Sequence, residues 1–247
     1  SNSAISWGLG GGIANDGQNG SPVMTVDQCT VSDNSAAQGG GIWNSGTLTV
    51  TRSLIKDNTA VYQGDAGNGG GIVSGRVQAP VRLTVMDSTI SGNTASHTGG
   101  GIALAMDSDD PNESLLLHVT VANNQATAEN DGAGSGGGIS VWRGTHAISN
   151  SIVFSNTAAT VDDNIQILSG SVVTSSVIAS GDPDPLLDPL QLNGGETETH
   201  ALRPGSPAID AGNDAYATAT NQRGVASPVG QHCDIGAYEY QPPSTLH

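Results

Sequence analysis

Two pairs of adjacent carboxylates are the residues best suited to acid–base catalysis in this chain. They are Asp109-Asp110 and Asp162-Asp163. Glycoside hydrolysis uses two carboxyl groups, one as a general acid and the other as a nucleophile or base. Adjacent acids in polar loops also occur simply as solvated charges, and that alternative stays open. The sequence therefore nominates these four aspartates as candidate catalytic residues.

The residues required by two other classes of polysaccharide-cleaving enzyme are partly missing from the sequence. A calcium-dependent lyase also needs an arginine or lysine base close to the sugar. The chain has only 7 Lys+Arg, and Arg203 and Arg223 fall in a non-repetitive C-terminal motif. The Gly-His-Gly and Arg-Ile-Lys segments expected of a polygalacturonase are absent. We therefore lean away from an enzyme, with a polysaccharide lyase or glycoside hydrolase as the alternative.

One loop has the composition of a calcium site. Residues 107–113 read Asp-Ser-Asp-Asp-Pro-Asn-Glu, and Ca²⁺ takes six to eight oxygen ligands. Asp107, Asp109, Asp110 and Glu113 are the candidate ligands. The central glycine and alternating ligands of an EF-hand are missing, so a solvated loop is the alternative. We expect no other cofactor, and the histidines lack the spacing of a zinc site.

Three tryptophans are candidates for contact with a glycan. Trp7, Trp43 and Trp142 lie close to glycine-rich corners, and exposed aromatic rings stack on sugars. The alternative is that the rings seal the fold. The two cysteines, Cys29 and Cys233, fall in distant parts of the expected fold, so we predict two buried free thiols and no disulfide.

Charge and composition narrow the class of protein. There are 23 Asp+Glu, the formal net charge is -16, and only 3% of the residues are aromatic. Strong negative charge repels nucleic acid and anionic membranes, so we expect no nucleic-acid partner. No run of 18 apolar residues is present, so no membrane span is expected in this segment. The scarcity of aromatic residues favours a thin core of β-branched side chains.

A sequence repeat of about 30 residues determines the fold in which all of these candidate residues would be placed. Gly-Gly-Gly-Ile occurs five times, about once every 30 residues, and a period of 20 to 50 residues is typical of solenoids. Short runs that alternate apolar and polar residues lie between the glycine blocks and predict strands. The repeated isoleucines, which should form one inward column, are Ile13, Ile42, Ile72, Ile102 and Ile139.

A second recurring residue is an asparagine followed by Ser, Thr or Gln and then Ala. Asparagine suits a tight corner between strands, and stacked amides can hydrogen bond to one another from coil to coil. The column contains Asn34, Asn58, Asn93, Asn124 and Asn156. The sequence thus predicts an all-β, right-handed, single-stranded parallel β-helix of about five to six coils over residues 1–180. Prolines and the loss of repetition predict an irregular cap, residues 181–247, packed on the last coil.

The repeats and the tail resemble known families. Gly-Gly-Gly-Ile alternating with Ser-x-Ile-x-x-Asn-Thr-Ala resembles the repeats of polymorphic outer membrane proteins. The segments 184–190, 204–212 and 233–239 are similar to a choice-of-anchor Q region. The resemblance implies a secreted bacterial β-helix protein, displayed at the cell surface, usually without enzymatic activity and with a cell-envelope anchor beyond the tail.

Together these observations give an expected function. We expect a non-enzymatic extracellular or cell-surface structural protein, such as a scaffold, an adhesin or a fibre subunit. The alternative is a carbohydrate-active enzyme or a glycan-binding module on the same helix. Because Asn2-Ser3-Ala4 matches the end of a repeat, we expect a longer precursor with a signal peptide. An uncovered first coil would also allow head-to-tail self-association.

Overall fold

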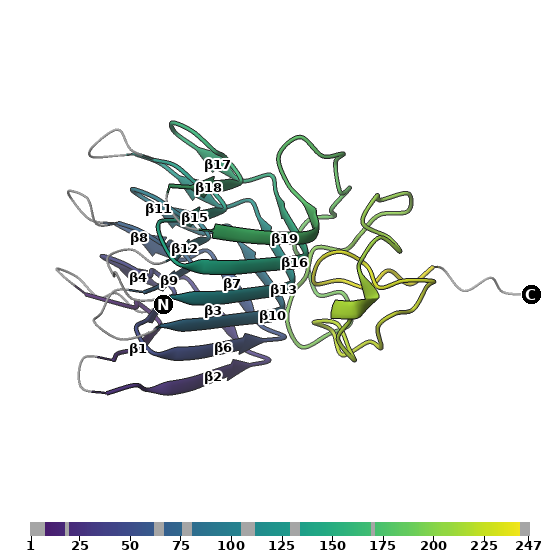
Figure 1. The fold of residues 1–247 in the computed structure, drawn as a ribbon, viewed down its shortest axis with the longest axis horizontal. Coiled ribbons are helices and arrows are strands. Elements are labelled where there is room, and N and C mark those ends of the chain that lie inside the picture. The colour runs from purple at the N-terminus through teal and green to yellow at the C-terminus, as the bar shows by residue number, and fades with distance from the viewer. Residues whose placement is uncertain are drawn as a thin grey trace, which may run out of the picture.

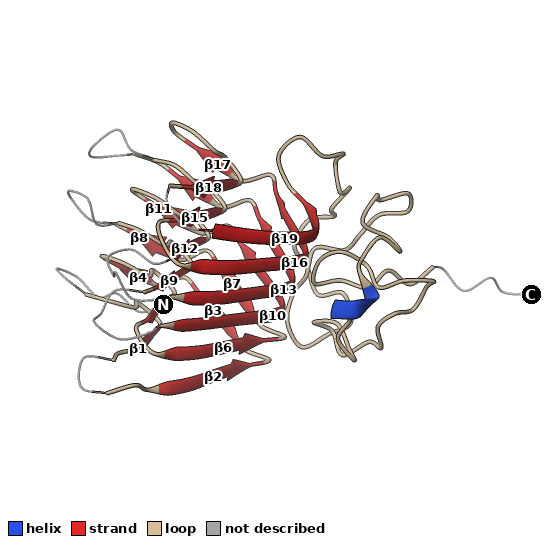
Figure 2. Ribbon diagram, in the orientation of Figure 1, coloured by secondary structure: helices blue, strands red, loops and turns tan. Residues whose placement is uncertain are grey.

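The fold is a stack of short parallel strands with an irregular region at its side. The computed structural model describes residues 8–17, 20–61, 67–75, 81–104, 112–128, 134–168 and 171–242. Within these ranges the regular structure is nearly all strand, and the single short helix is the 3₁₀ turn η1 (Asp214–Tyr216). Figures 1 and 2 show the strands stacked as successive coils. The predicted all-β parallel β-helix is confirmed.

Three parallel sheets form the walls of the solenoid. The first has six strands in the spatial order β1 (Ile13–Asn15), β5 (Ile42–Asn44), β9 (Ile72–Ser74), β12 (Ile102–Leu104), β15 (Ile139–Val141) and β18 (Ile165–Ile167). The eight-stranded second sheet runs β2 (Val23–Asp27), β6 (Thr47–Thr51), β10 (Arg82–Ser91), β13 (Glu113–Ala122), β16 (Thr145–Phe154) and β19 (Ser171–Ile178). In the same sheet, β7 (Leu54–Lys56) pairs with the second half of β10, and β3 (Thr30–Ser32) pairs with β7. The third contains β4 (Ser35–Ala36), β8 (Thr59–Ala60), β11 (Thr94–Ala95), β14 (Gln125–Ala126) and β17 (Thr157–Ala158).

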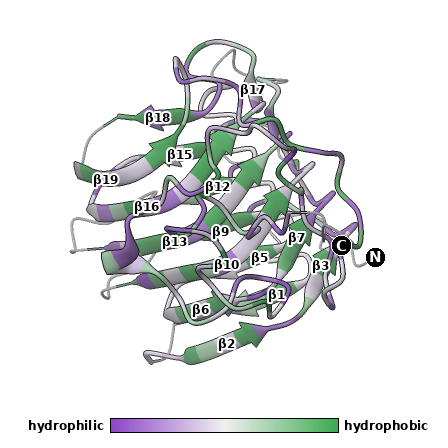
Figure 3. Ribbon diagram, turned by 90° about the vertical axis from the view of Figure 1, so that its right-hand side faces the viewer, coloured by the Kyte–Doolittle hydropathy of each residue, from purple (hydrophilic) through white to green (hydrophobic). Residues whose placement is uncertain are grey.

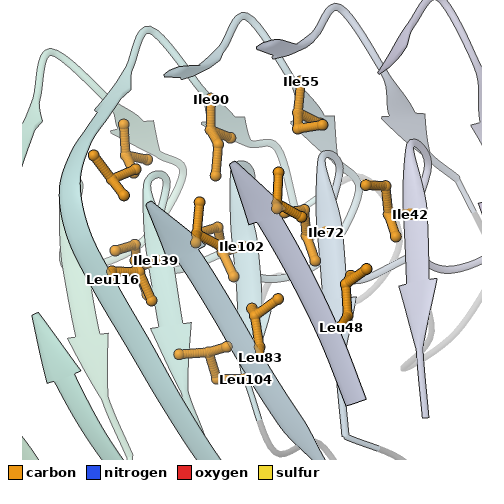
Figure 4. Packing of buried hydrophobic residues seen from close by; sticks show 14 of the residues in the cluster. Ile42, Leu48, Ile55, Ile72, Leu83, Ile90, Ile102, Leu104, Leu116 and Ile139 are labelled. Atoms are coloured by element: carbon orange, nitrogen blue, oxygen red, sulfur yellow. The ribbon is translucent and has the colours of Figure 1, made fainter. Parts of the chain in front are cut away.

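The register of the strands stacks like residues on like and so builds the core. Ile13 pairs with Ile42, Ile42 with Ile72, and the same column continues to Ile102 and Ile139. Leucine, isoleucine and valine side chains from the second sheet meet this column, as Figure 4 shows. These side chains are small and β-branched or γ-branched, so they fill a narrow interior without aromatic residues. This packing explains the low aromatic content.

Buried asparagines tie the coils together at one corner. Each Nδ2 donates to the Oδ1 of the next asparagine in the column, at 3.0 Å for Asn34 to Asn58 and 2.9 Å for Asn93 to Asn124. The same oxygen also accepts the backbone N–H of the preceding asparagine. The row extends one step beyond the repeat, because Asn156 donates to Asn164 at 2.9 Å. The complete row contains Asn34, Asn58, Asn93, Asn124, Asn156 and Asn164.

The C-terminal region contacts several coils of the solenoid. Residues 181–242 lie beside the solenoid rather than over its last coil (Figure 1). Their side-chain contacts run from Lys56, which pairs with Glu198, to Asn150, which bonds to Asn213. The region also touches the last coil, where Asn213 Nδ2 donates to Ser175 Oγ at 3.4 Å and Ile178 packs with Leu202. Its contacts therefore include the last coil and extend along the flank of earlier coils.

The two cysteines are both free, but only one of them is buried. Cys233 is buried, whereas Cys29 is exposed. The expectation of two buried thiols is wrong for Cys29, because it follows β2, the strand at the edge of its sheet. The equivalent Ser53 and Ser88 of later coils are fully covered.

This difference predicts the reactivity of the thiols. In the native protein one thiol, Cys29, should react rapidly with a maleimide or a disulfide reagent. Burial raises the pKa of Cys233 to about 12, so the reactive thiolate is scarce and we expect labelling only on unfolding. Mass spectrometry of native and urea-unfolded protein measures both sites, with Cys29→Ser as the control. Rapid native labelling of Cys233 would contradict this assignment.

Candidate functional site

Of the candidate catalytic carboxylates, the structure describes Asp162 and Asp163, and both belong to a turn. Asp162 has a left-handed φ of 57°, and the Asp163 carboxylate accepts the backbone N–H of Ala158 at 2.7 Å. Both side chains are exposed. Asp107, Asp109 and Asp110 lie outside the described residues. The geometry therefore gives Asp163 a turn-capping role.

The remaining candidate calcium ligand is engaged elsewhere. The Glu113 carboxylate forms an ion pair with the Arg82 guanidinium at 2.6 Å, across adjacent strands of the second sheet. Among the described residues, no group of three or more His, Cys, Asp or Glu side chains could hold a metal ion. Calcium at Asp107, Asp109 and Asp110 stays a prediction.

The expected glycan contact is wrong for Trp43. Its side chain is 2% exposed and packs against Val73 and Ala103 on the outer face of the first sheet. Trp142 is half-buried beside His97, with ring centroids 6.4 Å apart. Trp7 lies outside the described residues. Trp43 and Trp142 therefore pack against the protein itself, which agrees with the alternative that the tryptophan rings seal the fold.

The most extensive polar site is the contact between the solenoid and the C-terminal region, which we call the flank contact. Its solenoid side is a column of corner residues between the two halves of each long strand. Each has a left-handed φ, from 45° to 52°. A left-handed residue costs about 1 kcal/mol outside glycine, so the contacts must offset this strain. The column comprises Arg52, Asp87, His118 and Asn150.

Each of these corner residues meets a partner from the C-terminal region. Thr218 Oγ1 donates to Asp87 Oδ1 at 2.8 Å. Asn150 binds the backbone of Asn213 twice, accepting its N–H at 2.8 Å and donating to its carbonyl at 3.1 Å. His118 Nε2 lies 3.1 Å from the carbonyl oxygen of Tyr216, and the Arg52 carbonyl accepts the Thr197 hydroxyl at 3.2 Å. The corners thus position a line of donors and acceptors along the solenoid axis.

A second row of contacts lies further along the same strands. Thr89 Oγ1 donates to Gln222 Oε1 at 2.6 Å, and the Gln222 amide donates to Thr197. The Thr120 hydroxyl accepts the backbone N–H of Ala237 at 3.0 Å. Apolar packing fills the space between these polar rows, and its buried members are Ile152, Ile178, Leu202, Ala208 and Ile235. The flank contact is therefore a packed interface with matched hydrogen bonds.

Two serine–histidine pairs resemble the hydroxyl–imidazole unit of hydrolases. The Ser91 hydroxyl lies 2.9 Å from His200 Nε2, while His200 Nδ1 lies 2.8 Å from the Asp188 carbonyl oxygen. Ser114 and His146 are paired at 2.7 Å inside the solenoid. Both imidazoles are nearly covered, at 3% and 1% exposure. Burial also lowers the pKa of each imidazole, which fits neutral structural pairs.

Burial also perturbs two acids of the flank contact. It raises the pKa of Asp87 to about 7, against the opposing effects of the Thr218 hydrogen bond and the charge of Arg52. Burial likewise raises the pKa of Asp234 to about 6. The pKa of His118 is lowered, again mainly by burial. The C-terminal region thus covers several groups that favour their neutral forms.

The raised pKa of Asp87 gives a testable pH dependence. An acid whose pKa is higher in the folded protein stabilises the fold fully below its unfolded pKa near 4, and this stability is lost as the pH rises through about 7. Asp87→Asn keeps an acceptor for Thr218 and tolerates the left-handed φ. We therefore expect the variant to be about 1–3 kcal/mol more stable than the wild type at pH 7.5, and the difference to shrink to about 1 kcal/mol or less at pH 4.5.

Urea unfolding at these two pH values measures the effect. Asp33→Asn is the matched control, because Asp33 also has a left-handed φ, of 57°, and is exposed. The control removes an exposed carboxylate, so it should change the free energy of unfolding at pH 7.5 by less than about 0.5 kcal/mol. Equal stability of wild type and Asp87→Asn at both pH values would contradict the assignment.

The residues of the flank contact were missed by reasoning from the sequence. A signal was present, because each corner residue comes directly before the small residue that recurs at Ser53, Ser88 and Ser151. A polar residue at that place interrupts the alternation of a long strand and so marks a bend. The sequence around each corner residue does not indicate which segment of the chain packs against it.

A shallow hollow on the open face of the second sheet is the other candidate surface. Outward side chains of Arg82, Thr84, Glu113 and Thr145 line it. Leu115, Ala147 and Val173 line it as well, and among the described residues no Phe, Tyr or Trp side chain does. Such a surface can hydrogen bond to a polar ligand without stacking on it.

Comparisons with known proteins leave the geometry as the main guide to function. No protein-family model, no curated protein and no solved structure matches this chain. Within the described ranges, no helix has the length and apolarity needed to cross a membrane.

Proposed function

We propose that this chain is a non-enzymatic structural rod of a secreted or surface-displayed bacterial protein, and that its C-terminal region serves as a brace. The observation that carries the proposal is the flank contact. Hydrogen bonds from the C-terminal region reach successive coils, at Arg52, Thr89, Thr120 and Asn150. A brace of this kind is expected in a protein that must keep its shape under load.

The brace counters the characteristic weakness of a solenoid. Each repeat contacts only its neighbours, so coils can open one at a time. A region bonded to several coils makes the opening of one coil require the loss of contacts to the others. The ion pair of Lys56 with Glu198, at 2.5 Å, extends the brace to the corner beside the asparagine row. The brace thus couples coils that would otherwise unfold separately.

Charge and sequence resemblance support the extracellular setting. A net charge of -16 favours solubility and disfavours association with nucleic acid. The repeats resemble those of polymorphic outer membrane proteins, and the tail resembles the choice-of-anchor Q region, which implies a cell-envelope anchor. Scaffold, adhesin and head-to-tail fibre subunit are the roles that suit such a rod.

Glycan binding is the second candidate function, and the hollow lined by Arg82, Thr84, Glu113 and Thr145 favours it. Charged and hydroxyl side chains at a flat sheet face can hydrogen bond to sugar hydroxyls. Binding there would add an adhesin role without requiring catalysis. The burial of Trp43 removes one of the stacking residues on which the original glycan expectation rested.

A polysaccharide screen separates these functions. The protein is incubated with neutral and acidic polysaccharides, with and without Ca²⁺, and new reducing ends and unsaturated uronates are measured. We expect no cleavage. Cleavage that is lost in Asp162→Ala or Asp109→Ala would overturn the structural proposal. Binding without cleavage, weakened by Arg82→Ala and not by Arg203→Ala, would assign the glycan function to the sheet face.

The brace itself is tested by native-state hydrogen exchange. Amides of β10, β13 and β16 should exchange only through global unfolding in the wild type. Gln222→Ala removes bonds to both Thr89 and Thr197, and should open a faster, local route for these amides. Unchanged exchange in the variant would contradict the brace.

A further inference from the structure

One end of the solenoid stays uncovered although the chain continues past it. Ile167 belongs to the column of Leu104 and Val141, which are 1% and 0% exposed, yet it is 51% exposed. Thr174 continues the column of Leu116 and Ile148 and is also exposed. Residues 179–242 follow this end and turn to the flank instead (Figure 1). The end of the core is therefore open to solvent.

The strands at this end have free edges. β17, β18 and β19 each lie last in their sheet, and no other described strand pairs with their outer edges. Figure 3 shows them at the end of the stack opposite to β2. β19 is eight residues long, Ser171–Ile178, and contains no charged residue and no proline. Proteins normally protect exposed edges with lysine, proline, a bulge or a covering element; β19 has neither lysine nor proline, and its regularity is broken only at Ser176, which has a left-handed φ of 50°.

We propose that a second copy of this chain covers the end, in a closed dimer related by a twofold axis. In such a dimer β19 of each copy pairs with β19 of the other as antiparallel strands, and the exposed apolar residues of the two ends meet. The end supplies both halves of the contact, since a twofold interface uses the same patch on each subunit. The inference holds whether the rod is a scaffold or a glycan binder.

Charge favours this end for self-association. The chain carries a net charge of -16, so two copies repel one another over most of their surfaces. The residues of β17, β18 and β19 are all uncharged, so pairing of these strands brings together no like charges of their own, whereas the exposed Asp162 and Asp163 in the turn between β17 and β18 add to the repulsion. Residual repulsion between the two acidic bodies is screened by salt. Dimer formation should therefore strengthen as the ionic strength rises.

Sedimentation velocity over a wide range of protein concentration tests the proposal. It is performed in reducing buffer, because the exposed Cys29 could otherwise crosslink two copies. The wild type should reach twice the monomer mass and stop there. Thr174→Lys places a charge at the open end and should keep the protein monomeric. Thr145→Lys, at an exposed position on the outward face of β16, should dimerise like the wild type.

The alternatives give different masses. A wild type that stays monomeric at every concentration overturns the proposal, as does equal dimerisation of Thr174→Lys and wild type. Growth beyond two copies also overturns it, since this indicates head-to-tail stacking. If Thr174→Lys does not fold by circular dichroism, Ile167→Asp provides the same test at a second exposed residue of the end.

Discussion

Replacing Gly100 by alanine should destabilise the protein by more than about 4 kcal/mol, or prevent folding altogether. An added Cβ would lie 2.5 Å from the carbonyl carbon of Gln125 and would also collide with the carbonyl oxygen of Gly137. Both atoms belong to the backbone of neighbouring strands or turns, so neither can rotate away. The coils would have to separate, and the hydrogen bond from Gly100 N–H to the Gly136 carbonyl would be lost.

Equilibrium unfolding in urea, or the yield of soluble protein, measures this effect. Gly20→Ala is the matched control, because an added Cβ there meets no atom within 4 Å. The control should change the free energy of unfolding by less than about 0.5 kcal/mol. Similar stability of Gly100→Ala and wild type would mean that the glycine triplets do not set the spacing of the coils.

Asn93→Ala should cost about 3–5 kcal/mol, because it leaves several buried groups without partners. Asn93 Oδ1 accepts both the backbone N–H and the side-chain amide of Asn58, each at 3.0 Å. Its own amide donates to Asn124 Oδ1 and to the carbonyl of Ile55, each at 2.9 Å. For a chain of this size the loss corresponds to a fall in melting temperature of about 6–20 °C.

Thermal unfolding followed by circular dichroism checks this prediction. Gln125→Ala is the control, since Gln125 is exposed and lies at the same corner of the solenoid. Asn93→Asp adds a further test, because a carboxylate cannot donate to Asn124 and should be tolerated poorly at neutral pH. A melting temperature of Asn93→Ala equal to that of the control would show that the asparagine row contributes little to stability.

The repeated part of the fold could be predicted from the sequence because its information is redundant. The isoleucine at Ile42 has equivalents at Ile72 and Ile102, so a period in the sequence becomes a column in space. The asparagine row follows from the same regularity. Its last member, Asn164, comes only eight residues after Asn156, so it falls outside the repeat and could not be found from the period.

The rest could not be predicted because it depends on contacts between unlike segments. The position of residues 181–242 rests on matches such as Asp87 with Thr218 and Asn150 with Asn213, which no local pattern encodes. The burial of Trp43 and the exposure of Cys29 depend on which coil each residue belongs to and on what packs against that coil. The sequence pattern shows only the position of each residue within its repeat.

The asparagine row has a direction, since every amide from Asn34 to Asn156 donates toward the later coil, and from Asn58 onward each also accepts from the earlier one. The amide dipoles are therefore aligned, and neighbouring hydrogen bonds polarise one another. Turning a single amide over would set nitrogen against nitrogen on one side and oxygen against oxygen on the other. The orientation of each amide is thus fixed by the amides of the neighbouring coils. The aligned dipoles give the solenoid an electrical polarity along its axis.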